Sequence, residues 1–80
     1  MYTEKDAIKI MKRIGVELPN DPLSARLIED GLMDSLQIMQ LFAEVESVVG
    51  ITIDQAEINP DNLESIETVV AMMNRLSWFI

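Results

Sequence analysis

The chain of 80 residues is predicted to be all-α: a small four-helix bundle with three main amphipathic helices, one short helix, and a long loop between helices 1 and 2. Apolar residues recur at helical spacing in three segments, and each segment follows a residue that can cap a helix. The one alternating stretch, ITI at 51–53, is too short for a strand. Neither half of the chain could bury its apolar faces alone, so residues 1–80 are expected to form one domain.

The first helix is expected between Thr3, which can cap it together with Asp6, and Gly15, which can end it. Its core face is predicted from the i, i+3, i+4, i+7 spacing of Ala7, Ile10, Met11 and Ile14. Residues 16–33 contain two prolines and a glycine without a sustained period. They are therefore expected to form a long connection, which is pinned to the core by Val16, Leu18, Leu23, Leu27, Ile28 and Leu32.

The second helix is expected from Ser35 to Val49, with Gly50 ending it. Its apolar residues divide between two faces. The core stripe comprises Ile38, Leu41, Phe42, Val45 and Val49. The opposite face is uncharged and comprises Leu36, Met39, Gln40, Ala43 and Ser47. A solvated helix face normally carries charge, so this strip is interpreted as a docking face; the alternative is a set of isolated exposed hydrophobic residues, which are common.

A short helix is predicted over residues 55–58. Asp54 with Glu57 three residues later is typical of a capping box. The pair Asn59–Pro60 is expected to end this helix, because a residue before proline avoids the helical region.

The last helix is expected after Ser65 as its cap. Its core stripe is predicted to comprise Ile66, Val69, Val70 and Met73. The chain ends in three large apolar residues, Trp78, Phe79 and Ile80. They are expected to fold back onto the bundle, and a contact with a partner is the alternative.

Composition and charge exclude several classes of function. The chain has no Cys and no His, which excludes disulfides, thiolate nucleophiles, imidazole bases and the usual zinc sites. Its net charge is −8, and the range from Leu27 to Asn74 contains ten acids but no Lys or Arg. Such a surface repels nucleic-acid phosphates and attracts basic patches on other proteins; the alternative is a charge excess that only keeps the protein in solution. No apolar run reaches the ~18 residues of a membrane span, and no signal peptide is recognisable, so a cytoplasmic, free-standing monomer is expected.

Catalytic and metal sites find little support in the sequence. A calcium loop starting at Asp54 would need oxygen ligands at the positions of Ala56 and Ile58. There is no G-x-S-x-G elbow and no glycine-rich phosphate loop. Paired carboxylates could act as acid and base, but nothing indicates a cleft. The chain is therefore expected to be no enzyme and to bind no metal.

Ser35 stands at the predicted start of the second helix, directly after Asp34. Backbone N–H groups are unpaired there and the helix dipole is positive, so a phosphate attached to this hydroxyl would be stabilised. Serine is also a common N-cap, and Ser35 could serve only in that role. The residues alone leave both interpretations open.

The stretch DGLMDSLQIMQLFAEVESVVGITID at 30–54 resembles the acyl carrier protein family, whose Asp-Ser-Leu motif opens the second helix after a long loop. NLESIETVVAMMNRL at 62–76 resembles the last helix of that family, so the resemblance covers nearly the whole chain. It implies that Ser35 carries 4′-phosphopantetheine, transferred from coenzyme A by a phosphopantetheinyl transferase that uses magnesium. Acyl or aminoacyl cargo would be bound as a thioester to the thiol of this arm.

The same resemblance implies the roles of further residues. Asp34 would help the transferase to recognise the site. The partner face would comprise Leu36, Met39, Gln40 and Ala43, with Glu57 and Ile58 of the short helix beside it. Its partners would be the transferase and the enzymes with basic docking patches that load and process acyl or aminoacyl groups.

Some residues differ from typical fatty-acid carriers, in which several positions of the second helix are acidic. The corresponding residues here are Gln37, Gln40 and Ser47. This difference favours a specialised carrier for a polyketide-like, aminoacyl or modified fatty-acyl pathway, and DGLMDSL is also similar to carriers of D-alanine and other amino acids. The alternative from another class is an unmodified acidic interaction adaptor in which Ser35 only caps a helix.

Overall fold

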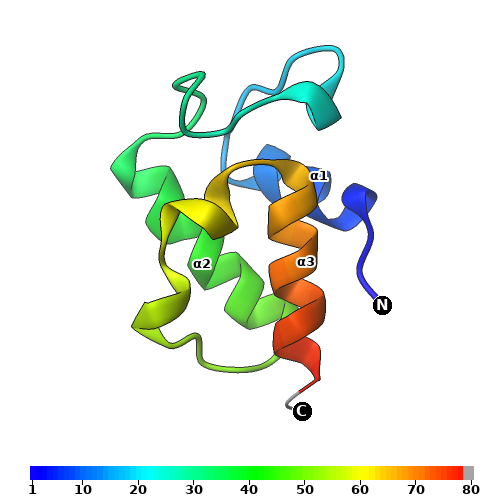
Figure 1. The fold of residues 1–80 in the computed structure, drawn as a ribbon, viewed down its shortest axis with the longest axis vertical. Helices are drawn as coiled ribbons and strands as arrows, with labels where there is room; N and C mark the ends of the chain where they lie inside the picture. Colours follow the sequence, from blue (N-terminus) through cyan, green and yellow to red (C-terminus); the bar gives the residue numbers. More distant parts are fainter. Residues whose placement is uncertain (79–80) are drawn as a thin grey trace.

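The computed structural model describes residues 1–78, apart from the side chain of Gln55, and it confirms the all-α class. Its α-helices are α1 (Glu4–Arg13), α2 (Ser35–Val49) and α3 (Ile66–Ser77). Its short 3-10 helices are η1 (Pro22–Ser24), η2 (Gln55–Glu57) and η3 (Pro60–Leu63). The described residues contain no strand, and each α-helix packs against the other two (Figure 1).

Helix α1 begins and ends at the predicted residues. The backbone N–H of Thr3 donates to the carboxylate of Asp6 at 2.8 Å, which is one half of a capping box. Gly15 follows the helix with a left-handed φ of 83°. The next N–H, that of Val16, donates to the carbonyl of Met11 at 2.9 Å and closes the last turn.

Substitution of Gly15 by alanine is expected to lower the free energy of unfolding by about 1 to 2 kcal/mol, because residues with a Cβ rarely adopt a positive φ. The cost is backbone strain alone, since a Cβ at this position would meet no atom within 4 Å. Urea denaturation of Gly15→Ala and Gly15→Asn measures it. Asparagine enters the left-handed region more readily, so equal losses for the two variants would contradict this explanation.

The core lies where the three α-helices meet, and it is built from aliphatic and methionine side chains. Its largest fully buried side chains are Ile10, Met11, Leu27, Leu41, Val45, Ile66, Val69, Met72 and Met73. On α2 the predicted stripe is confirmed, except that Ile38 is only half-buried. Ile14 and Val70 are also half-buried, whereas Met72 and Leu76, absent from the predicted stripe of α3, are buried. No polar or charged residue is buried in the described part of the chain.

The long connection between α1 and α2 crosses one end of the bundle and is pinned to it (Figure 1). Val16 and Leu27 are buried and Leu18 and Leu32 are half-buried, as predicted. The prediction is wrong for Leu23 and Ile28, which are 53% and 39% exposed, whereas Ala25 and Met33 are buried instead. The N–H of Leu27 also donates to the carbonyl of Glu64 at 2.9 Å, which joins the connection to the start of α3. A turn at Gly31, with φ 68°, then leads the chain into α2.

The two ends of the described chain are tied together by an amide side chain. The N–H of Tyr2 donates to Oδ1 of Asn74 at 2.7 Å, and Nδ2 of Asn74 donates to the carbonyl of Tyr2 at 3.1 Å. Met1 and Trp78 line the same surface hollow beside this pair. This contact packs the start of the chain onto α3.

The short helix predicted over residues 55–58 is present as the 3-10 helix η2, and a second 3-10 helix, η3, follows it. Asn59 separates them, and its Oδ1 accepts the N–H of Asn62 at 3.2 Å, so it caps η3. Pro60 occupies the first turn of η3, where its missing N–H and fixed φ are tolerated. Proline therefore ends one turn as predicted and begins the next, so that the segment between α2 and α3 contains two 3-10 helices.

The prediction for the chain end is wrong for Trp78. Trp78 is 84% exposed, so it does not fold back onto the bundle. Phe79 and Ile80 lie outside the described residues. None of the described helices has the length and hydropathy needed to cross a membrane.

Candidate functional site

The start of α2 places Ser35 as the first helical residue, with Asp34 as the cap. Oδ1 of Asp34 accepts the N–H of Gln37 at 2.8 Å, and Oε1 of Gln37 accepts the N–H of Asp34 at 3.0 Å. The interpretation of Ser35 as the cap is therefore wrong. Ser35 is exposed, and its hydroxyl makes no hydrogen bond to any described residue.

The backbone around Ser35 fits a phosphate ester. The N–H groups of Ser35 and Leu36 have no acceptor in the described part of the chain, whereas the N–H groups of Gln37 and Ile38 are bonded to Asp34. Helix α2 has 15 residues, and its positive dipole end lies at Ser35. A phosphate on the hydroxyl would lie beside the two free N–H groups, which are suitable donors to an anion.

The uncharged face of α2 is exposed, as predicted. Leu36 is 63% exposed and Met39 is 71% exposed. The remaining members of this face, Gln40, Ala43 and Ser47, are exposed as well. Because the strip starts next to Ser35, a partner that contacts it would also reach the hydroxyl.

A pocket of about 190 Å³ lies between α2 and the segment that follows it. Its lining residues are Ile38, Met39, Phe42, Ala43, Glu46, Ile53 and Ile58. The pocket thus brings together three residues of the predicted partner face, Met39 and Ala43 of α2 and Ile58 of the following segment. Two further members, Leu36 and Gln40, lie on α2 outside the pocket.

Sequence reasoning missed the remaining walls of this pocket. Glu46 accepts the backbone N–H of Ile53 at 2.7 Å and so holds the following segment against α2. Helical periodicity places Glu46 on a flank of α2, but it carries no signal for a contact with a backbone N–H seven residues later. Ile38 and Phe42 were assigned to the core, and both also face the pocket.

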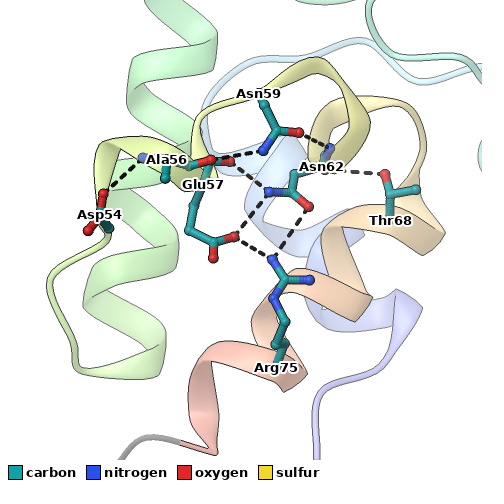
Figure 2. A network of polar contacts seen from close by, with 7 residues as sticks. All are labelled: Asp54, Ala56, Glu57, Asn59, Asn62, Thr68 and Arg75. Carbon is teal, nitrogen blue, oxygen red and sulfur yellow. Dashed lines mark hydrogen bonds and ion pairs between the residues drawn. The ribbon is translucent and has the colours of Figure 1, made fainter.

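Glu57, also predicted on the partner face, is directed elsewhere. Its carboxylate forms an ion pair with Arg75 of α3 and accepts a hydrogen bond from Nδ2 of Asn62 at 3.1 Å (Figure 2). Glu57 is half-buried and does not line the pocket, whereas its neighbour Ile58 does. The distribution of charge along the sequence could have identified Arg75 as a partner for an acid, because it is the only base after Arg26.

The bases and acids of the described residues form ion pairs away from Ser35, and one acid remains exposed beside it. In the part of the chain that the structure describes, no three metal-ligating side chains converge. Two further ion pairs use bases away from the site, Arg13 with Glu44 at 2.7 Å and Arg26 with Glu29 at 2.6 Å. The hydrogen bond from Arg26 to Glu29 raises the pKa of the Arg26 guanidinium. Asp34 remains as an exposed acid beside Ser35.

Comparison with known proteins finds no relative of this chain. No protein-family model, no curated protein and no solved structure matches the chain. The resemblance to acyl carrier proteins therefore depends on the residues quoted from the sequence, and the functional interpretation depends on the geometry around Ser35.

Proposed function

We propose that this chain is a carrier protein that bears 4′-phosphopantetheine on Ser35 and presents acyl or aminoacyl groups to partner enzymes as thioesters. The observation that carries the proposal is the position of the Ser35 hydroxyl. It is exposed at the first residue of α2, it is not used for capping, and two unpaired backbone N–H groups adjoin it. The resemblance of residues 30–54 to acyl carrier proteins supports the same conclusion.

Attachment of the arm is a phosphoryl-group transfer. Oγ of Ser35 loses its proton and bonds to the phosphorus that carries pantetheine in coenzyme A. The bond between the two phosphates of coenzyme A breaks, and the nucleotide half leaves. A separate transferase with magnesium would catalyse this step, while the chain contributes the accepting oxygen and, through Asp34, an acidic group for recognition.

The attached arm would supply a thiol, which the chain itself lacks because it contains no Cys. Tethering gives cargo a high effective concentration at each enzyme that the carrier visits. The exposed strip that contains Leu36 and Met39 provides a contact small enough to exchange between partners. We take η2 as the short fourth helix of the predicted bundle.

Intact mass spectrometry tests the proposal directly. The purified chain is incubated with coenzyme A, magnesium and a broad-specificity phosphopantetheinyl transferase, and it is expected to gain one phosphopantetheine mass. Ser35→Ala is expected to gain nothing, because the accepting oxygen is absent. Ser24→Ala removes an exposed serine of η1, outside α2 and its uncharged face, and is expected to load like the parent chain.

An unmodified interaction adaptor is the second candidate, favoured by the exposed apolar strip alone. It predicts no mass gain in the parent chain or in either variant. A parent chain that stays unloaded while a control carrier is loaded in the same tube would contradict the carrier proposal and favour the adaptor.

A further inference from the structure

Residues 54–62, which lie between α2 and α3, are held by polar contacts rather than by buried side chains. Ile53 and Leu63 on either side are buried, but no side chain between them is buried among those that the structure describes. The ends of the segment are anchored, at Ile53 by Glu46 and just beyond Leu63 by the bond between the Glu64 carbonyl and the connection. Segments with few buried apolar contacts open at a lower free-energy cost than the rest of a domain.

The centre of the segment is tied to α3 by Arg75 (Figure 2). The guanidinium of Arg75 pairs with the carboxylate of Glu57 in η2 and lies 3.5 Å from Oδ1 of Asn62 in η3. Asn62 in turn donates to the carbonyl of Glu57 at 2.7 Å. Among the described residues, the only other side chain from outside that bonds to the segment is Thr68, which donates to the carbonyl of Asn62 at 3.2 Å.

No other base can take over the role of Arg75. The sequence contains no Lys or Arg between Arg26 and Arg75, and Arg26 is paired with Glu29. Glu57 is also the more buried member of its pair, since its side chain is 25% exposed against 47% for Arg75. Removal of Arg75 would therefore leave a half-buried carboxylate without a cation, and a carboxylate gains hydration when it moves toward water.

Movement of this segment would change the pocket beside α2. Ile58 follows Glu57 directly and lines the pocket together with Met39 and Phe42. Phe42 is buried at present. Displacement of residues 54–62 away from α2 would widen the pocket and expose the Phe42 ring.

We propose that Arg75, Glu57 and Asn62 form a clasp that keeps residues 54–62 closed against α2, and that release of this clasp opens the pocket. The clasp is a property of the chain itself and does not depend on whether Ser35 carries an arm. Its test therefore uses the unloaded protein, and the outcome is separate from that of the loading assay.

Hydrogen–deuterium exchange of the unloaded chain measures the opening. The reporters are the N–H groups of Ala56, Glu57 and Asn62, which are bonded within the segment. In Arg75→Gln they are expected to exchange about two- to fivefold faster, the size of effect that one partly exposed ion pair provides. Amides of α1 and α2 are expected to keep their rates, since the ion pair does not contact them.

Arg13→Gln is the matched control, because it breaks another partly exposed arginine–glutamate pair, the one with Glu44, outside the segment. It is expected to leave the three reporters unchanged. The double variant Glu57→Arg/Arg75→Glu reverses the pair and is expected to restore slow exchange. Unchanged reporter rates in Arg75→Gln, an equal rise throughout the chain, or an equal rise in Arg13→Gln would each overturn the clasp.

Exposure of the Phe42 ring provides the second readout. A soluble paramagnetic chelate is expected to broaden the ring protons of Phe42 more strongly in Arg75→Gln than in the parent chain or in Arg13→Gln. Faster exchange without any increase in this broadening would show that the segment moves without opening the pocket, and the proposal would be overturned on that point.

Discussion

Leu41→Ala is expected to lower the free energy of unfolding by about 2 to 5 kcal/mol, the range found when a buried leucine is truncated and a cavity remains. Leu41 is fully buried in the middle of α2. A domain of this length has a total stability of roughly 4 to 12 kcal/mol, so a large share of it would be lost. The melting temperature is expected to fall by roughly 10 to 30 °C.

Leu36→Ala is the matched control for this prediction. It truncates the same residue type on the same helix, but on the exposed face, and it is expected to change stability by no more than about 0.5 kcal/mol. Thermal and urea denaturation followed by circular dichroism measure both variants. Comparable losses for Leu41→Ala and Leu36→Ala would contradict the assignment of the two faces of α2.

Leu36→Glu is expected to reduce the kcat/KM of Ser35 loading by about ten- to thirtyfold, as expected when an apolar anchor at the centre of an interface is lost. Leu36 lies beside Ser35, and 63% of its side chain is exposed. An added carboxylate at this point would have to lose its hydration when a partner covers the strip. An acid in the first turn of a helix also interacts favourably with the dipole, so the fold is expected to tolerate the change.

Leu23→Glu controls for the added negative charge. Leu23 is an exposed leucine in η1, in the long connection and away from α2. Its replacement is expected to leave the loading rate within about twofold of the parent, because it adds the same charge outside the interface. If Leu36→Glu and Leu23→Glu slowed loading equally, the added negative charge would explain the loss. This result would contradict the assignment of the uncharged strip to the partner face.

The ends of the α-helices could be predicted from the sequence because they depend on capping residues close to them in the chain. Gly50 has a left-handed φ of 86° directly after α2, so the position of the glycine alone marks the helix end. Ser65 caps α3 by accepting the N–H of Thr68, and its place before an apolar periodic stretch is equally local. The core stripe of α2 followed from helical periodicity for the same reason.

The identity of the α2 cap was not readable in this way. Asp34 and Ser35 are both good capping residues and adjoin each other, so residue type cannot decide between them. The choice depends on where the incoming chain is anchored, and Met33 is buried immediately before Asp34. Burial of Met33 depends on the packing of the whole bundle, which a local sequence pattern does not describe. Because Asp34 is the cap, the hydroxyl of Ser35 is not used for capping.

The segment after α2 differs from prediction because its conformation depends on contacts distant in sequence. Arg75 meets Glu57 across 18 residues, and no periodic pattern encodes such a pair. The exposed position of Trp78 has a similar cause. Met72, Met73 and Leu76 already fill the core side of α3, so hydropathy alone overestimated the burial of the residue that follows the helix.

The hydrogen bonds that join Tyr2 to Asn74 bring Met1 and Trp78 to a common surface. Chains whose ends lie close together commonly tolerate circular permutation. A short glycine–serine bridge between these ends, with new termini opened at the exposed pair Asn20–Asp21, would retain the complete bundle. Such a rearranged polypeptide would keep α2 and the residues that precede it in one continuous stretch, and it offers a route for inserting this domain into an engineered host protein.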